Sequence, residues 1–391
     1  MSKYQNVQWK DNGKLKLLII VGTRPEIIRL SEVIKKARCY FDVILAHTGQ
    51  NYDYNLNGVF FHDLDLAEPE VYLNTVGNHL GSTMGNIISE SYELMATIEP
   101  DAVLVLGDTN SCLSVISAKR LHIPIFHMEA GNRSKDECLP EETNRRIVDI
   151  ISDVNMAYSE HARKYLADTG LPKERTYVTG SPMAEVLRAN LPKIEGSDIH
   201  QRLQLKKRNY ILLSAHREEN IDTDKNFLSL FNAVNKMAEK YDMPILYSCH
   251  PRSKNKILST GFELDRRVIQ HDPLGFHDYN NLQMNAFAVV SDSGTLPEEA
   301  SFFSSIGKPI PAVCIRTSTE RPEALDKGDF ILSGIDEKGL LQAVDVAVEM
   351  NKNNHLGIPV PDYMDENVSD KVVKIIQSYT NVVNKMVWRK E

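Results

Sequence analysis

Acidic residues in the first half of the chain follow short apolar runs, in positions where they can serve as acids or bases. Asp108 ends the run 101–108, Glu129 ends a second run, and Glu141 lies in the loop that comes soon after. Each acid alone has a simpler explanation, because Asp108 and Glu141 suit a first helical turn and Glu129 suits an ion pair with Arg133. Together they favour an active site, since carboxylates whose pKa values are pushed apart can divide acid and base roles.

Arg24 stands directly after another apolar run, residues 14–21. Its neighbours predict a helix start, with Thr23 as N-cap, Pro25 in the first turn and Glu26 completing a capping box. That pattern leaves Arg24 unexplained. It is either a solvated charge or a cation beside the free N–H groups of a helix N-terminus, an arrangement that suits a diphosphate.

The second half of the chain carries similar polar clusters around His216, Ser293 and Arg321. Ser293 and Gly294 precede a predicted helix whose N–H groups can hold a phosphate, and an acid one turn further on can hold ribose hydroxyls. Short Ser-Asp-Gly segments are also ordinary turns, and a lone histidine is more often a capping or core residue. Residues 319–323 repeat the helix-start pattern and leave Arg321 unexplained.

The elements that position these residues alternate between strand and helix. Apolar runs rich in branched residues predict buried parallel strands at 14–21, 41–50, 101–108, 123–129 and 154–159, and in a second series at 210–215, 243–248, 267–271, 286–291 and 310–315. Helical stretches such as 82–98 and 111–121 separate them. This alternation predicts an α/β protein with two doubly wound parallel sheets, whose ligands bind at the carboxyl ends of the strands.

The domain boundaries follow from breaks in this alternation. Residues 1–13 are polar and predict a disordered or loosely attached tail, and residues 14–190 form the first domain. Residues 191–198 resemble a linker, residues 199–366 form the second domain, and residues 367–391 predict a helix that packs back on the first. Two such domains predict an active site in the cleft between them.

Composition excludes several classes of protein. The chain has 391 residues, 42% of them hydrophobic, and a formal net charge of −8, which argues against a nucleic-acid or membrane-surface binder. Five scattered cysteines without C-x-x-C spacing favour a reducing, cytoplasmic location. The motifs G-x-G-x-x-G, G-x-S-x-G, H-E-x-x-H and the P-loop are missing, so we expect no cofactor and no metal. No run of about 18 apolar residues occurs in the sequence, so we also expect no membrane insertion.

Seven motifs together resemble a known family. They occur at residues 22–26, 107–109, 127–131, 140–145, 216–220, 291–294 and 319–323. Their order is that of the non-hydrolysing UDP-N-acetylglucosamine 2-epimerases, and the resemblance extends from about residue 14 to the C-terminal helix. It implies a GT-B-like fold of two Rossmann-type domains, a homodimer, and a UDP-sugar substrate held between the domains.

The resemblance also implies a reaction and roles for residues. The family removes the C2 proton, eliminates UDP, returns a proton to the opposite face and re-adds UDP, without nicotinamide or metal. Its catalytic positions fall on Asp108, Glu129 and Glu141 as the acid/base group and on His216 at the diphosphate. Its substrate-binding positions fall on Arg24, Arg29, Arg145, Ser293, Gly294, Glu299 and Arg321, with Ser293 and Gly294 at the diphosphate and Glu299 at the ribose.

Departures from the usual motifs bear on the sugar. Arg29 stands where the UDP-N-acetylglucosamine branch usually has Lys, and Thr295 stands where a second Gly is common. The motifs look more like the branch that makes UDP-N-acetyl-L-fucosamine from UDP-2-acetamido-2,6-dideoxy-L-talose for capsule or O-antigen synthesis. Arg and Lys are not equivalent beside a phosphate or carboxylate, so these changes are expected to alter the sugar pocket.

Other functions remain open on these residues. The first alternative is a UDP-N-acetylglucosamine 2-epimerase that makes UDP-N-acetylmannosamine. A GT-B glycosyltransferase would share the fold, and an inactive nucleotide-sugar-binding protein would share the pocket.

Overall fold

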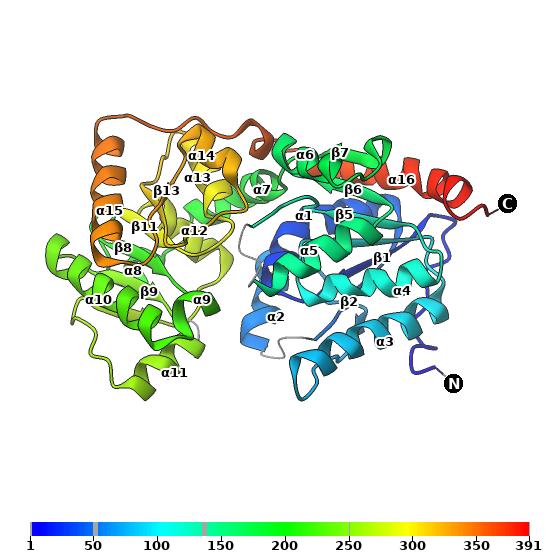
Figure 1. Cartoon of the computed structure of the whole chain (residues 1–391), viewed down its shortest axis with the longest axis horizontal. Helices are drawn as coiled ribbons and strands as arrows, with labels where there is room; N and C mark the ends of the chain where they lie inside the picture. Colours follow the sequence, from blue (N-terminus) through cyan, green and yellow to red (C-terminus); the bar gives the residue numbers. More distant parts are fainter. Residues whose placement is uncertain (1, 50–53, 135–138, 250, 391) are drawn as a thin grey trace. The chain divides into compact units, whose positions relative to one another are not determined.

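The computed structural model describes residues 2–49, 54–134, 139–249 and 251–390. The chain divides into two compact units: unit 1 comprises Met1–Val186 and Asp365–Glu391, and unit 2 comprises Leu187–Met364 (Figure 1). Each unit is a parallel sheet with helices against it, so the predicted α/β class is confirmed.

The sheet of unit 1 has the order β3-β2-β1-β4-β5-β6-β7. Its strands are β1 Lys16–Val21, β2 Asp42–His47, β3 Val71–Tyr72, β4 Ala102–Leu106, β5 Ile125–Met128, β6 Val154–Ala157 and β7 Thr176–Val178. In register, Leu17 lies between Val43 of β2 and Ala102 of β4. Strands buried on both faces need near-continuous apolar residues, which is why β1, β2, β4, β5 and β6 were predicted from the sequence. The short strands β3 and β7 at the sheet edges were not predicted.

The sheet of unit 2 has the order β10-β9-β8-β11-β12-β13. Its strands are β8 Ile211–Ser214, β9 Ile245–Ser248, β10 Val268–His271, β11 Ala288–Ser291, β12 Ala312–Cys314 and β13 Ile331–Leu332. The winding direction of the chain reverses between β1 and β4 in unit 1 and between β8 and β11 in unit 2. Ligands of doubly wound sheets bind outside the carboxyl ends of the strands at such switch points.

Helices cover both sheets. Those of unit 1 are α1 Arg24–Tyr40, α2 Tyr54–Asp63, α3 Leu80–Ile98, α4 Val115–Arg120, α5 Pro140–Ile151, α6 Glu160–Asp168 and α16 Val368–Met386, with 3-10 turns η1 Asn110–Ser114 and η2 Lys173–Arg175. Helix α7 Met183–Glu195 joins the units, and unit 2 adds α8 Ile199–Arg202, α9 Glu218–Ile221, α10 Asp224–Tyr241, α11 Pro251–Thr260, α12 Phe276–Met284, α13 Leu296–Ser305, α14 Pro322–Lys327, α15 Glu337–Lys352 and η3 Pro361–Tyr363. In the described part of the chain, every helix is too short or too polar to cross a membrane.

Helix α16 returns the chain to unit 1 and packs on α1. Lys36 of α1 forms an ion pair with Asp370 at 2.8 Å. The N–H of Ser369 donates to the carboxylate of Glu185 at 2.8 Å. The C-terminal helix therefore completes unit 1.

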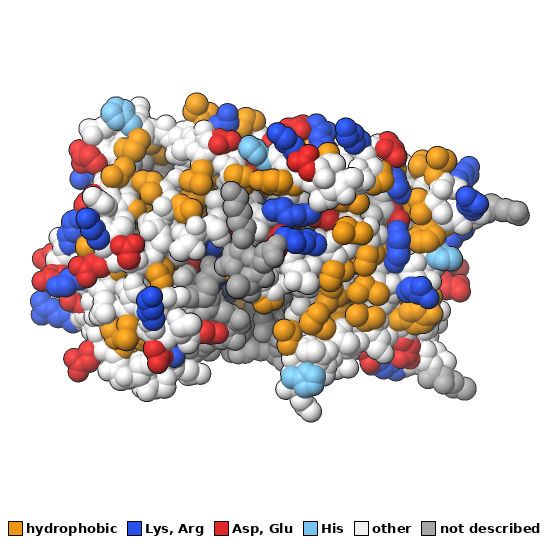
Figure 2. All heavy atoms as spheres, in the orientation of Figure 1, with side chains coloured by type: hydrophobic (Ala, Val, Ile, Leu, Met, Phe, Trp, Pro, Cys, Tyr) orange, Lys and Arg blue, Asp and Glu red, His pale blue; other side chains and the backbone are white. Residues whose placement is uncertain are grey.

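Apolar side chains are exposed on the helices of unit 1. Leu80 and Tyr92 on α3 and Ile150 on α5 are large apolar residues with exposed side chains. Figure 2 shows apolar side chains gathered over these helices.

The N-terminal segment is anchored to unit 1 by Tyr4 and Trp9, although most of its other residues are exposed, so the predicted loose tail is wrong. Tyr4 is 4% exposed and joins the core formed by Leu18, Leu94 and Met95. Its hydroxyl donates to Glu90 at 2.7 Å, and the indole N–H of Trp9 donates to the carbonyl of Ile98. The polar composition of the segment concealed two aromatic side chains that pack against this core.

The predicted linker at 191–198 is also wrong over most of its length, because α7 continues to Glu195 through Pro192. Ile194 and Ile199 are both fully buried, so packing holds the chain where a proline predicted a break. The units divide after Val186 and after Met364, whereas the sequence placed the divisions near 190 and 366.

Removing the Tyr4 ring should destabilise unit 1. We expect Tyr4→Ala to lower the free energy of unfolding by about 3 kcal/mol because a buried ring leaves a cavity, and Tyr4→Phe to lower it by about 1 kcal/mol because one hydrogen bond is lost. The measurement is urea unfolding followed by tryptophan fluorescence, which reports unit 1 because both tryptophans, Trp9 and Trp388, lie there.

Tyr40 provides the matched control because it belongs to the same unit and is 60% exposed. Tyr40→Ala should change the free energy of unfolding by less than about 0.5 kcal/mol. Equal effects of Tyr4→Ala and Tyr40→Ala would show that the N-terminal segment adds nothing to the core.

Candidate active site

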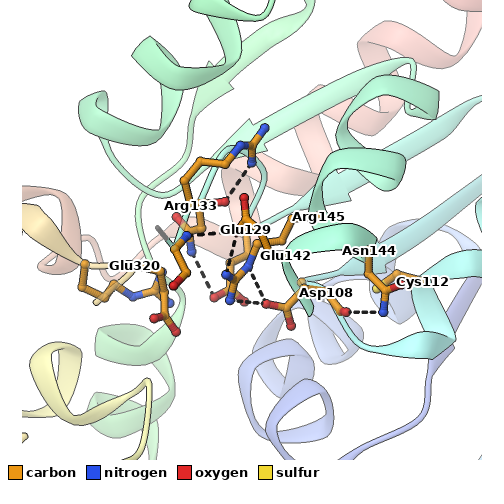
Figure 3. A network of polar contacts seen from close by, with 12 residues as sticks. Asp108, Cys112, Glu129, Arg133, Glu142, Asn144, Arg145 and Glu320 are labelled. Atoms are coloured by element: carbon orange, nitrogen blue, oxygen red, sulfur yellow. Dashed lines mark hydrogen bonds and ion pairs between the residues drawn. The ribbon is translucent and has the colours of Figure 1, made fainter. Parts of the chain in front are cut away.

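Asp108 lies directly beyond β4, at the switch point of unit 1, and is held by Arg145 of α5 (Figure 3). The Nε and Nη2 atoms of Arg145 lie 2.7 and 2.6 Å from Oδ2 of Asp108. Arg145 is 5% exposed, and its Nη1 also lies 3.2 Å from Glu142. The guanidinium that the sequence assigned to substrate therefore positions Asp108.

Glu129 follows β5 with a positive φ of 63° and contacts Arg29 of α1. Nη1 of Arg29 lies 2.5 Å from Oε2 of Glu129, and Nδ2 of Asn132 donates to Oε1 at 3.2 Å. A Cβ at Gly107 would lie 3.2 Å from Oε2 of Glu129, and the φ of Gly107 is +82°. Glu129 thus lies against the backbone that precedes Asp108, so two of the three predicted acids are neighbours.

Glu141 and Glu142 form the first turn of α5, where the helix dipole favours acids. Glu141 is partly exposed. Glu142 is 2% exposed and accepts from the N–H of Ser134 at 3.0 Å and from Arg145. Sequence reasoning selected Glu141 and missed Glu142, although its spacing of three residues from Arg145 on a helix signals this contact.

A second buried carboxylate, Asp149, holds the loop that carries Glu129. Its oxygens lie 2.6 Å from Nη1 of Arg133 and 3.1 Å from Nδ1 of His127, and the N–H of Gly131 donates to it at 3.2 Å. Nε2 of His127 lies 2.8 Å from the carbonyl of Gly107. Arg133 therefore pairs with Asp149, whereas the simpler explanation of Glu129 had assigned Arg133 to Glu129.

The predicted capping box at the start of α1 is wrong in detail. Thr23 is the N-cap, but its hydroxyl donates to Oε2 of Glu26 at 2.8 Å, and the N–H of Gly22 donates to the same oxygen at 3.0 Å. Ser111, beyond β4, donates to Oε1 of Glu26. Burial raises the pKa of Glu26, and these hydrogen bonds oppose the rise. Glu26 therefore links the loops after β1 and β4.

Arg24 is the first residue of α1, as the sequence predicted. It is partly exposed, and its guanidinium lies 5.3 Å from the centre of the Phe60 ring. Stacking of this kind holds a guanidinium in place without using its hydrogen-bond donors. Its predicted diphosphate contact stays a prediction.

His47 ends β2 opposite Val21, at the same sheet edge. It is 1% exposed, and its Nδ1 accepts the N–H of Gly49 at 2.9 Å. An accepting Nδ1 carries no proton, and burial accordingly lowers the pKa of His47 to about 4.

Asp292 occupies the switch point of unit 2, beyond β11, and organises the residues around His216. Its Oδ2 accepts the N–H groups of His216 and Arg217, each at 2.9 Å, and Nδ2 of Asn220 at 3.1 Å. Nδ1 of His216 lies 3.0 Å from Oδ1. Burial by itself would raise the pKa of Asp292, but His216 and the N–H of Arg217 hold it well below its usual range. Sequence reasoning missed this residue.

Ser293, Gly294 and Glu299 lie together at the start of α13. The hydroxyl of Ser293 is 2.9 Å from that of Thr295, which donates to Oε1 of Glu299 at 2.9 Å. Glu299 is 6% exposed, and Gln283 of α12 donates to its Oε2 at 2.7 Å. A Cβ at Gly294 would lie 3.2 Å from Oε1 of Glu320, so this position suits glycine.

Arg321 has an internal position, and its predicted contact with substrate stays a prediction. It is 1% exposed, and its Nη2 lies 3.2 Å from Glu298 of α13. A sequence pattern does not distinguish a buried arginine from one at a binding surface, and Glu298 supplies the charge that burial requires. Among the described residues, groups of His, Cys, Asp and Glu suited to a metal ion are absent.

Comparisons with known proteins were made after this geometry. A family model described as UDP-N-acetylglucosamine 2-epimerase matches residues 34–377. A UDP-N-acetylglucosamine 2-epimerase of Methanococcus maripaludis is 34% identical over 354 residues, 88% of this chain and 94% of the relative. A UDP-2,3-diacetamido-2,3-dideoxy-D-glucuronate 2-epimerase of Pseudomonas aeruginosa is 32% identical over 331 residues, 82% of this chain and 88% of the relative.

Solved structures give the same result. A UDP-N-acetylglucosamine 2-epimerase structure from Rickettsia bellii has 43% identity and a TM-score of 0.88, covering 96% of this chain and all of the other. The Methanocaldococcus jannaschii UDP-GlcNAc 2-epimerase in complex with UDP-GlcNAc and UDP has 31% identity and a TM-score of 0.85, covering 93% and 99%.

Acidification should destabilise unit 1 through His47. In the unfolded chain the His47 side chain binds a proton near pH 6.5, whereas in the folded chain it stays neutral down to about pH 4. The free energy of unfolding therefore falls as the pH drops through this window. Between pH 7 and pH 5, the free energy of unfolding of His47→Gln should fall by less than that of wild type, and the difference should be up to about 2 kcal/mol. The measurement is urea unfolding followed by tryptophan fluorescence.

The matched control is His62→Gln, because the side chain of His62 is 93% exposed. This variant should lose as much stability as wild type between the two pH values. If His47→Gln did the same, proton uptake at His47 would not contribute to acid sensitivity.

Proposed function

Because the chain belongs to the UDP-N-acetylglucosamine 2-epimerase family, we propose that the carboxylates of unit 1 invert C2 of a UDP-2-acetamido sugar. The chain is a UDP-sugar 2-epimerase, an isomerase of the non-hydrolysing type, and its two α/β units have the GT-B-like fold. The observation that carries the assignment of residues is the pairing of Asp108 with Arg145 and of Glu129 with Arg29 at adjacent strand ends.

The proposed reaction breaks the C2–H and C1–O bonds and forms both again, with the new proton on the opposite face of C2. A carboxylate removes the proton from C2, the bond from C1 to the UDP oxygen breaks, and a double bond forms between C1 and C2. A protonated acid then delivers a proton to the opposite face of C2, and the UDP oxygen bonds again to C1. Asp108, Glu129 and Glu141 are the proposed acid/base group, and positioned groups of this kind contribute rate factors of about 10²–10⁴ each.

The polar residues of unit 2 suit the nucleotide. Ser293 and Gly294 precede α13, whose N-terminus favours an anion, and His216 is fixed beside them by Asp292. We assign these residues, together with Arg24, to the diphosphate, and Glu299 to the ribose. Stabilising the departing diphosphate is the electrostatic task of this group.

For the sugar itself, we propose UDP-2-acetamido-2,6-dideoxy-L-talose, which C2 inversion converts to UDP-N-acetyl-L-fucosamine. Arg29 supports this proposal, because it replaces the usual Lys and contacts Glu129 directly. The second candidate is UDP-N-acetylglucosamine, which the names of the Methanococcus and Rickettsia relatives favour. The Pseudomonas relative is named for a third sugar, so sugar preference varies within the family.

We further propose a cytoplasmic homodimer that serves capsule or O-antigen synthesis. The apolar side chains exposed on α3 and α5 support a contact between copies, because exposed apolar patches mark interaction surfaces. Thiols outside any disulfide at Cys39, Cys112 and Cys314 fit a reducing compartment.

Incubation in D₂O with each UDP-sugar, without an acceptor, tests the reaction. The wild-type protein should introduce deuterium at C2 of the product, detected by NMR. Asp108→Asn should lower the exchange rate at least about 100-fold while UDP binding is retained, because the change removes an acid/base group and not the nucleotide ligands. Glu160→Gln, on the exposed start of α6, is the control and should exchange as wild type does.

Two outcomes contradict the proposal. Wild-type protein without exchange in either sugar would exclude 2-epimerisation of both candidates. Full exchange in Asp108→Asn would remove that residue from the mechanism.

Arg29→Lys tests the choice of sugar. A lysine offers a single ammonium in place of a planar guanidinium, so Glu129 should shift relative to C2. We expect the ratio of kcat/KM for UDP-N-acetylglucosamine to that for the L-talose sugar to rise about tenfold. Lys35→Arg makes a lysine–arginine exchange elsewhere on α1, at a partly exposed position, and should leave the ratio unchanged. An unchanged ratio in Arg29→Lys would show that Arg29 does not select the sugar.

A further inference from the structure

Thr295 connects the two groups of unit 2 that we assign to the nucleotide. It is the N-cap residue of α13, with φ −88° and ψ −14°, and its hydroxyl is directed to side chains. Oγ1 lies 2.9 Å from Oγ of Ser293 and 2.9 Å from Oε1 of Glu299. The hydroxyl therefore bridges the residue before Gly294 and the acid one turn into the helix.

Counting protons fixes the direction of this bridge. A hydroxyl has one hydrogen, and an ionised carboxylate can accept but not donate. Thr295 therefore donates to Glu299, and Ser293 donates to Thr295. The N–H of Thr295 also donates to Oγ of Ser293 at 3.3 Å, so Ser293 and Thr295 share two hydrogen bonds.

Glu299 is held from two sides. Thr295 engages Oε1, and Gln283 of α12, which is fully buried, donates to Oε2 at 2.7 Å. A carboxylate with one fixed donor on each oxygen has a fixed plane, and its remaining lone pairs have fixed directions. Glu299 can then accept a hydrogen bond from a ligand hydroxyl without changing its own conformation, which lowers the free-energy cost of binding.

We infer that Thr295 is a positioning residue that orients Glu299 toward the ribose hydroxyls, and so sets how strongly this chain distinguishes UDP from deoxy analogues. The inference rests on the proposed role of Glu299 in binding the ribose. Thr295 occupies the position of the second glycine in the common motif, and glycine has no hydroxyl to offer. The contact with Glu299 is thus particular to chains with a hydroxyl residue here.

The test is calorimetric binding of UDP, 2′-deoxy-UDP and 3′-deoxy-UDP to full-length wild type, Thr295→Val, Thr295→Gly and Thr295→Ser. Wild type should bind UDP at least about tenfold more tightly than one of the deoxy analogues, as expected for a hydrogen bond to a charged group. Thr295→Val and Thr295→Gly should reduce this ratio of affinities to about twofold or less, because they weaken the binding of UDP and leave the binding of that analogue unchanged. Thr295→Ser keeps the hydroxyl and should keep the ratio.

Turnover gives an independent readout. The KM for the UDP-sugar should rise in Thr295→Val by a factor similar to the loss of UDP affinity, with kcat changed less than about twofold, because the ribose is remote from the reacting carbon. Thr260→Val is the control, since the hydroxyl of Thr260 bonds the helix carbonyls of Lys256 and Ile257 in the same unit. It should match wild type in both measurements.

The outcomes separate this inference from the proposed function. Wild type that binds UDP and both analogues equally would overturn the ribose role of Glu299 and the inference with it. If wild type and Thr295→Val distinguish UDP from the deoxy analogue equally well, the inference about Thr295 is overturned. The proposed function, which deuterium exchange at C2 tests, is then unaffected.

Discussion

The inner strands of both sheets, such as β1, β4 and β11, are buried on both faces, and this constraint determines where the chemistry lies. Residues such as Leu17, Ile19, Leu104 and Leu212 have no exposed surface, so a polar group within such a strand loses its hydration and needs a buried partner, as His127 has in Asp149. Polar residues are therefore pushed to the strand ends. At the carboxyl ends, helix N-termini and loop N–H groups can satisfy them.

Each switch point is organised by one buried carboxylate, and the two carboxylates are stabilised differently. Glu26 is held in unit 1 by neutral donors, the N–H of Gly22 and the hydroxyls of Thr23 and Ser111, and burial raises its pKa. Asp292 is held in unit 2 by N–H groups and by His216, and its pKa is lowered despite burial. Glu26 follows β1 in unit 1 and Asp292 follows β11 in unit 2, so the two carboxylates lie beside different strands of their switch points and their pKa values shift in opposite directions.

The sequence predicted much of this arrangement because a strand buried on both faces needs a continuous apolar run. It therefore located strands such as β1 and β4, and with them Asp108 and Arg24. It failed where packing outweighs local preference, at the tail held by Tyr4 and at the helix that continues through Pro192. It also failed to identify Asp149 and Asp292, because a buried partner of a functional residue has no sequence signature of its own.

Two arginines that the sequence assigned to substrate lie against carboxylates in the structure, and this changes what a substitution at either site means. Arg145 fixes Asp108, and Arg29 fixes Glu129. A buried carboxylate that loses such a partner incurs a penalty of about 3–5 kcal/mol unless it takes up a proton. If Glu129 has the acid/base role that we propose, an exchange of arginine for lysine at position 29 alters that carboxylate together with any contact to the sugar. Under our proposal, sugar preference and acid/base geometry are thus coupled through one ion pair, that of Arg29 with Glu129.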